Sequence, residues 1–519
     1  LLLIPAIGED FFPTIYAGQF RLHVRAPTGT RVEVTEEYFG KVEQEIKKII
    51  PEDEIAQMID NIGIPSITYN LAFGDNATIG VYDGEILVAL GKNKTHSTPY
   101  YMAKLRERLP QLFPNLIFYF QPADMVNQIL NFGLPAPIDV RIIGYNIHEN
   151  LPIARELCER ISAVPGAVDV HLHQAVDAPE LYLNVDRTRL AEVGLRQVDV
   201  SNDVLLSYGT GSVVTPNFWL DRKMGIPYQI AVQTPKYRIN TVENLMQMPI
   251  SSSKTREPQL LQDVATLERR ASPGVVTHFN IQPTYDIFAS VQGRDLGGVA
   301  GDIQEIINEY NAKMSPGNEI VIKGLVESMQ QAFKRLAIGF IFSIILVYSI
   351  MVINYQSWLD PFIIIMALPG ACSGIVWMLY LTHTTFNVPS LMGTIMCIGV
   401  AIANSILLVT FGNMQLREGK DTIHAMHAAA CARLRPVLMT AFAMIVGMAP
   451  MAFGIGEGAE QNAPLARAVI GGLLFATLTT LFFVPVVFTL LRKKANPYLE
   501  HEKEVYVPTE HEILEDDDG

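Results

Sequence analysis

The chain has 519 residues, of which 49% are hydrophobic and 18% are charged, and its formal net charge is -14. The charged fraction is below the roughly 25% typical of soluble domains, and the acidic balance argues against a nucleic-acid partner, because nucleic-acid-binding proteins present basic surfaces. The cysteines show neither metal-site nor disulfide-framework spacing; they are Cys158, Cys372, Cys397 and Cys431.

Residues 1–8 form a short apolar start. Leu1–Ile7 follows neither an initiating methionine nor a basic signal-peptide region. We therefore expect this stretch to be the end of a membrane helix, and the sequence to be a fragment that begins inside that helix.

Residues 9–330 alternate short strand patterns with amphipathic helices. Phe20–Ala26 alternates apolar and polar residues, as a half-buried strand does, and 35–50 places apolar residues on one helical face. The strand–helix–strand pattern recurs at 139–173 and again at 285–323. It is typical of α/β (α+β) ferredoxin-like folds and suggests an internal duplication.

Residues 176–266 have a different texture. Within them, 208–235 is expected to form a long hairpin or arm, on which Phe218 and Trp219 are exposed. Large exposed apolar groups indicate an interface with a neighbouring chain, and an ordinary packed hairpin is the alternative.

Five apolar stretches follow, each close to the roughly 20 residues that a helix needs to cross a bilayer. They predict a five-helix transmembrane bundle within 331–494, followed by an acidic tail at 495–519. The stretches are 336–354, 361–382, 391–411, 434–455 and 467–491.

The distribution of Lys and Arg predicts the orientation of this bundle. Basic residues gather in the connection 412–433 and directly after the last helix, whereas the loop 456–466 holds Glu457 and Glu460 without any Lys or Arg. We therefore expect 412–433 and the C-terminus in the cytoplasm, and the loop and residues 9–330 outside.

Four motifs, in order around one large external region, carry a resemblance to a known family. They are Gly8-Glu9-Asp10-Phe11-Phe12-Pro13, Gly293-Arg294-Asp295-Leu296-Gly297, Tyr355-Gln356-Ser357-Trp358-Leu359-Asp360-Pro361 and Arg433-Leu434-Arg435-Pro436. Over essentially its whole length, the sequence resembles the C-terminal half of a resistance-nodulation-division (RND) efflux permease of the acriflavine-resistance type.

The resemblance implies a homotrimer in a bacterial inner membrane, surrounded by lipid, that works with a periplasmic adaptor protein and an outer-membrane channel. It implies periplasmic porter sequence at 9–175 and 267–330, and a docking region at 176–266. The arm at 208–235 is similar to the family's inter-protomer hairpin.

The resemblance also marks candidate ion-coupling residues. In the family, a lysine in the helix at 391–411 pairs with two carboxylates of the other half, but this sequence has Ala403 at that position, followed by the retained Asn404. Arg433 and Thr440 match the family's arginine and threonine, and their spacing places them about two turns apart on one helical face. The alternatives are a snorkelling arginine and ordinary interhelical hydrogen-bonding groups.

A substrate pocket is implied where the family has a flexible loop, which matches 67–82 here. Aromatic side chains suit low-specificity binding of apolar molecules, and core packing is the alternative. The candidates are Tyr69, Phe73, Tyr82, Phe118 and Phe120.

The sequence shows no catalytic constellation, no phosphate-binding glycine loop and no cofactor motif. We therefore expect a non-enzymatic transporter driven by an ion gradient, and proton-driven export of hydrophobic or amphiphilic small molecules is the leading interpretation. Heavy-metal export remains an alternative, although soft metals need Met or Cys ligands that the external region does not visibly supply. A non-transporting membrane scaffold of the same fold is a further alternative, favoured by the loss of the family lysine.

Overall fold

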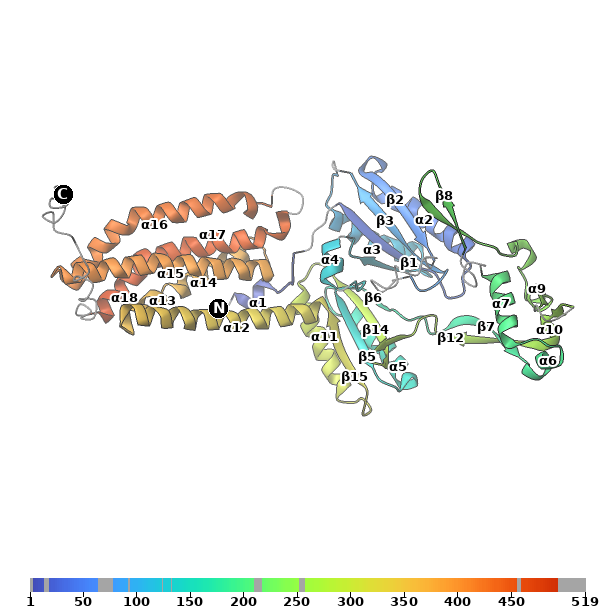
Figure 1. Ribbon diagram of the computed structural model, residues 1–519. Coiled ribbons are helices and arrows are strands. Elements are labelled where there is room, and N and C mark those ends of the chain that lie inside the picture. Colours follow the sequence, from blue (N-terminus) through green and yellow to red (C-terminus); the bar gives the residue numbers. More distant parts are fainter. Residues whose placement is uncertain are drawn as a thin grey trace, which may run out of the picture. The chain divides into compact units, whose positions relative to one another are not determined.

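The computed structural model describes residues 3–13, 18–63, 78–91, 94–123, 125–131, 133–209, 217–251, 257–454 and 459–492. The chain divides into two compact units. One is formed by Leu1–Gln174 and Val275–Gly519, and the other by Ala175–Gly274. Figure 1 traces both along the chain.

The first sheet of the larger unit is antiparallel, with the strand order β2-β3-β1-β4. Phe20, Leu22 and Val24 of β1 are buried because alternate side chains of a strand point to one face. The chain order strand–helix–strand–strand–helix–strand is that of a ferredoxin-like fold. The elements are β1 (Gln19–Arg25), α2 (Val32–Ile49), β2 (Ile55–Ile62), β3 (Asp83–Leu90), α3 (Thr98–Leu112) and β4 (Ile117–Gln121).

The second sheet repeats this order, since β6, β14, β5 and β15 lie side by side and β13 pairs with β14. The smaller unit is inserted between β6 and β14. The elements are β5 (Ile138–Ile143), α5 (Ile147–Ser162), β6 (Ala167–Leu172), β13 (Thr277–Phe279), β14 (Gln282–Val291), α11 (Leu296–Asn311) and β15 (Glu319–Gly324), with the short α1 (Ile4–Ile7) and α4 (Met125–Leu130) preceding the two sheets. The predicted ferredoxin-like subdomains are confirmed.

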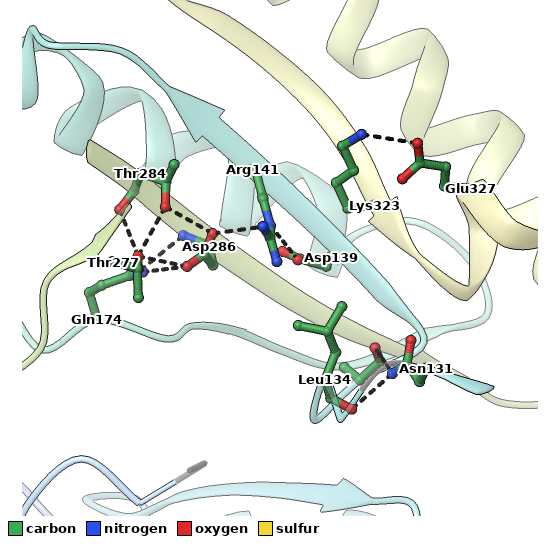
Figure 2. A network of polar contacts seen from close by, with 11 residues as sticks. Asn131, Leu134, Asp139, Arg141, Gln174, Thr277, Thr284, Asp286, Lys323 and Glu327 are labelled. Atoms are coloured by element: carbon green, nitrogen blue, oxygen red, sulfur yellow. Dashed lines mark hydrogen bonds and ion pairs between the residues drawn. The ribbon is translucent and has the colours of Figure 1, made fainter. Parts of the chain in front are cut away.

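A polar network holds the segments by which the chain leaves and re-enters the second sheet (Figure 2). Gln174 Nε2 and Thr277 Oγ1 both donate to Asp286 Oδ2, at 2.7 and 2.8 Å. Arg141 Nε lies 3.7 Å from Asp286 Oδ1 and 2.6 Å from Asp139 Oδ2. Burial raises the pKa of Asp286, although its hydrogen bonds and Arg141 oppose this rise. The network therefore pins both ends of the insertion to the sheet.

The smaller unit is built on a two-stranded antiparallel sheet of β7 and β12. Its core includes Leu190, Val200, Ile250 and Leu261. Since β12 pairs with β7 up to Ser272, this unit extends past residue 266, the predicted end of the docking region. The elements are β7 (Ala178–Val185), α6 (Arg187–Glu192), α7 (Gln197–Tyr208), β8 (Asn217–Asp221), β9 (Ile226–Ile230), α9 (Val242–Met246), β10 (Pro249–Ile250), β11 (Gln259–Leu260), α10 (Leu261–Val264) and β12 (Ala265–Ser272).

Among the residues that the structure describes, five helical segments of the larger unit are long and apolar enough to cross a membrane. They are α12 (Leu325–Tyr355), α13 with α14 (Leu359–Ile365 and Leu368–Leu381), α15 (Val388–Arg417), α16 (Thr422–Ala452), and α17 with a π turn and α18 (Ala463–Leu478, Thr479–Phe483 and Val484–Leu491). Small residues let α14 and α17 pack closely, since a Cβ on Gly374 would lie 2.4 Å from the Gly471 carbonyl oxygen.

Two of these helices begin earlier than the hydropathy pattern predicts. Helix α12 starts at Leu325, directly after β15, and α16 starts at Thr422 rather than near 434. The expectation that Arg433 lies at a helix start is therefore wrong, because it lies well inside α16. Hydropathy locates the apolar part of a helix, and the polar turns that continue it are invisible to such a pattern.

Candidate functional site

A cavity of about 610 Å³ opens between the two ferredoxin-like sheets of the larger unit. Phe20 and Phe120 line it from the first sheet, and Gln292 from the loop that follows β14. Two residues outside the sheets line it as well: Asp10, which precedes β1, and Thr385, which precedes α15. This volume lies within the range of small-molecule sites, roughly 300–1,000 Å³.

Arg106 of α3 reaches across this cavity to the second sheet. Its Nη2 lies 2.6 Å from Asp169 Oδ2, and its Nη1 donates to Gln292 Oε1 at 2.8 Å. Its guanidinium carbon lies 4.6 Å from the centre of the Phe120 ring. A forked guanidinium that binds a carboxylate while it stacks on an aromatic face is held in one orientation, so Arg106 fixes one wall of the cavity.

The predicted pocket aromatics occupy different environments. Phe120 lines the cavity, whereas Phe118 is half-buried and packs on Phe113, with ring centres 6.4 Å apart. Tyr82 is buried and is not among the cavity residues, and Tyr69 and Phe73 lie outside the described residues. A role of these aromatics in substrate binding stays a prediction.

A buried stack of aromatic rings joins the two sheets near this cavity. The Tyr119 ring lies between His23 and His171, with ring-centre distances of 4.3 and 3.7 Å. Arg25 Nη2 donates to Tyr119 Oη at 3.2 Å, and Arg25 Nη1 donates to the His173 carbonyl oxygen at 3.1 Å. Strands β1, β4 and β6 are thereby connected through one cluster.

Electrostatics keep the imidazoles of this cluster neutral. Burial lowers the pKa of His171 well below its usual value and that of His173 to about 3, and the charge of Arg25 acts in the same direction. Burial also lowers the pKa of His23, although its hydrogen bond to Asp83 opposes the shift. Arg25 and Asp83 therefore carry the charges, at an Nε–Oδ2 distance of 3.3 Å.

Neutral imidazoles are metal ligands, but this cluster is not arranged as a metal centre. Tyr119 separates two of the rings. Across the described part of the chain, no group of three His, Cys, Asp or Glu side chains gathers to hold a metal ion.

The predicted ion-coupling residues lie on two adjacent membrane helices. Arg433 of α16 is half-buried and its guanidinium carbon lies 5.1 Å from the Phe411 ring of α15, while its Nε has no partner among the described residues. Thr440 Oγ1 donates to the Val437 carbonyl oxygen of its own helix at 3.0 Å. On α15, Asn404 is buried but Ala403 is exposed. An ion-coupling role for Arg433, Thr440 and Asn404 remains a prediction.

Sequence reasoning missed the stacked cluster. Its members lie far apart in the chain, and only a weak signal exists: pairs of polar residues two positions apart in a strand, which share one strand face. These pairs are His23 with Arg25 and His171 with His173.

Comparison with known proteins places the chain in a family. The model of the AcrB/AcrD/AcrF family matches residues 1–492. The chain is 27% identical over 497 residues to the cation efflux system protein CzcA of Alcaligenes sp., covering 94% of this chain and 45% of that protein. It is 28% identical over 321 residues to the swarming motility protein SwrC of Bacillus subtilis, covering 61% of this chain and 30% of SwrC.

A crystal structure of a heavy metal efflux pump has the same fold, with a TM-score of 0.78 at 24% identity, over 95% of this chain and 50% of the pump chain. The chain thus spans about half the length of the curated relatives that it matches. With five apolar helices long enough to span a bilayer in its described part, it is a multi-pass membrane protein, and it belongs to the AcrB/AcrD/AcrF family of RND efflux permeases.

Proposed function

We propose that this chain is half of an ion-gradient-driven RND efflux pump and that the complete pump exports metal cations. The choice of metal cations as the cargo rests on one observation, the similarity over 94% of the chain to proteins named for cation efflux and for cobalt, zinc and cadmium resistance. This choice replaces the leading interpretation of the sequence, export of hydrophobic or amphiphilic molecules, with its alternative.

The chemistry of the cavity supports a borderline or hard divalent cation over a soft one. Gln19, Gln121 and Gln292, whose side chains carry amide oxygens, line it together with Met102, whereas none of the four cysteines does. Soft metals select thiolate and thioether ligands, and carbonyl oxygens suit harder cations. Zinc, cobalt and nickel are therefore expected ahead of copper and silver.

A second candidate cargo is a hydrophobic small molecule. The cavity is also lined by four phenylalanines, and aromatic walls suit apolar ligands. They are Phe11, Phe12, Phe20 and Phe120.

Assembly as a homotrimer in a bacterial inner membrane, with a periplasmic adaptor and an outer-membrane channel, belongs to this proposal. The hairpin of β8 and β9 supports it, because Phe218 and Trp219 are exposed on it. Transport itself requires no covalent chemistry of this chain, which we propose is not an enzyme.

The test uses the full-length pump, in a bacterial strain that lacks its own metal exporters. We expect a several-fold increase in tolerance to zinc, cobalt or nickel, and lower cellular metal content by elemental analysis. A protonophore should abolish both effects. Unchanged metal tolerance with active efflux of a hydrophobic dye would support hydrophobic small molecules as the cargo. Efflux of neither metal nor dye would favour a non-transporting membrane scaffold.

A further inference from the structure

The segment Gly8–Phe11 joins the membrane helices to the porter region. It pairs with the residues at the start of α15 and just before it: Asp10 N–H donates to the Phe386 carbonyl oxygen at 2.8 Å, and Val388 N–H to the Phe11 carbonyl oxygen at 3.1 Å. Phe386 N–H donates to the Gly8 carbonyl oxygen at 3.0 Å. The start of α15 is therefore fastened to this segment by main-chain hydrogen bonds.

The same segment caps the first turn of porter helix α11. Leu296 N–H donates to Asp10 Oδ1 at 2.9 Å, and Gly297 N–H to the Glu9 carbonyl oxygen at 2.8 Å. Asp295 Oδ2 accepts from Gly298 and Glu9 N–H at 2.7 and 3.0 Å. The first amides of a helix have no partner within the helix, so the segment supplies bonds that α11 needs, at the end where the helix dipole favours carboxylates.

A third connection reaches the outer ends of two further membrane helices. Arg467 of α17 donates through Nη1 to Thr384 Oγ1 at 2.7 Å, and through Nε to the Ala452 carbonyl oxygen at the end of α16, at 3.0 Å. Two residues after Thr384, Phe386 exchanges main-chain hydrogen bonds with Asp10 and Gly8. A continuous polar chain thus runs from α16 and α17 to α11.

Packing leaves this junction little freedom. Gly8 has a φ of +76°, and a Cβ at its position would lie 2.7 Å from Asp295 Cγ. Asp10, Thr385 and Leu296 also line the cavity, so a displacement of the junction displaces part of the cavity wall.

We propose that Gly8–Phe11, the loop 384–388 and the first turn of α11 form a rigid tie that carries movement of the membrane helices to the porter cavity. Asp10 and Arg467 are its positioning residues. The inference rests on the proposed function in that the tie serves a transport cycle, whichever cargo is exported.

Substitutions in the full-length pump test the two positioning residues. Asp10→Ala and Arg467→Ala should each lower export at least tenfold with normal expression and assembly, and Thr384→Val should reproduce the Arg467 effect with little change in shape. Asp10→Asn should retain much of the activity, because its amide oxygen still accepts from Leu296. Glu305→Ala, on an exposed position of α11, is the matched control and should export normally.

A cross-link distinguishes a tie from mere support of folding. Glu9 and Phe386 are directly paired, so Glu9→Cys with Phe386→Cys, in a pump without its native cysteines, should form a disulfide. The disulfide should leave export intact, because a rigid tie does not require these two residues to separate during transport. Export that is blocked once mass spectrometry shows the bond, and that returns when a reductant is added, would overturn the proposal.

Hydrogen exchange separates this inference from the proposed function, because it needs no cargo. Arg467→Ala should speed exchange of the amides of 296–298 at least tenfold relative to the natural pump, and Glu305→Ala should not. A pump that exports neither metal nor dye but shows this change would refute the proposed function and keep the tie. Unchanged exchange in an exporting pump would refute the tie.

Discussion

At the scale of single residues, Arg433 is the side chain on which ion coupling is predicted to depend. It lies inside α16 with its Nε unpartnered in the described structure, and Ala403 of α15 leaves the family's lysine position without a charge. A cation close to paired carboxylates lowers their pKa values, so Arg433 is expected to regulate proton release from the other half of the pump. Arg433→Ala should abolish export in proteoliposomes while expression and assembly remain normal.

Two further variants refine this prediction. Arg433→Lys should rescue export poorly because the forked guanidinium is lost. A pump that carries Ala403→Lys should either keep exporting when Arg433 is also replaced or show a shifted pH dependence of transport. Export at the natural rate by Arg433→Ala would show that coupling resides elsewhere.

The stacked cluster predicts a pH dependence of stability. A histidine whose pKa is lowered on folding binds protons more readily in the unfolded chain. Its contribution to the free energy of unfolding is therefore complete above the unfolded pKa of about 6.5 and falls as pH decreases. For His173, whose folded pKa is about 3, the loss continues over pH 6 to 4 at about 1.4 kcal/mol per pH unit. Hydrogen exchange of the β4 and β6 amides, followed as a function of pH, should measure this loss of stability.

His173→Phe keeps an aromatic ring but cannot bind a proton. In this variant, the free energy of opening measured by hydrogen exchange should change with pH less steeply than in the natural protein, by about 1.4 kcal/mol per pH unit. Asp83 does not confound this window, because its pKa is lowered from an ordinary carboxyl value by His23 and Arg25, despite burial, and its contribution is lost at lower pH. An unchanged slope would mean that His173 is not neutral in the folded protein.

At the scale of elements, the Asp286 network is predicted to fasten the ends of the inserted unit to the second sheet. Asp286→Ala removes one of the acceptors within reach of Gln174 Nε2 and of Thr277 Oγ1, and the loss of buried hydrogen bonds costs about 1–3 kcal/mol. Exchange of β13 and β14 amides should quicken accordingly, and limited proteolysis should cut more readily near 174 and 277.

The exposed ion pair of Arg270 and Glu268 provides the control, since both side chains are about half exposed. Arg270→Ala should change stability by less than about 1 kcal/mol. Equal effects of the two substitutions would contradict an anchoring role for the network.

At the scale of the whole molecule, the β8–β9 hairpin is predicted to contact a neighbouring protomer. Aromatic residues dominate the energy of most interfaces, and Phe218 and Trp219 are 62% and 58% exposed within one chain. Replacing both with Ala should weaken the oligomer on native gels. Tyr237→Ala, at an exposed site outside the hairpin, should leave it intact.

Membrane orientation is a second prediction at this scale. Basic residues near 412–433 favour the cytoplasm, so Lys420→Cys should resist an impermeant thiol reagent in intact cells, in a background without native cysteines. Tyr237→Cys, at an exposed site outside the hairpin, should react once the outer membrane is permeabilised. The reverse labelling pattern would invert the topology.

The membrane helices and the ferredoxin-like units were predictable from the sequence because their signals are local. Uninterrupted apolar residues identify α12 to α18 within a few turns, and alternation identifies β1. The early starts of α12 and α16 were not predictable, since polar residues continue a helix without changing its hydropathy signal. The same local reasoning located Arg433 but placed it at a helix end.

Residue types, periodicity and charge bias by themselves determined the fold class, the five membrane helices found in the described part of the chain and their expected orientation. The tertiary structure decided which distant residues meet: His23 with His171 around Tyr119, Arg106 with Gln292 across the cavity, and Asp10 with Leu296. These contacts join positions up to 286 residues apart. Sequence periodicity reports which face of an element is buried, whereas the partner on that face is set by the packing of whole sheets and helices.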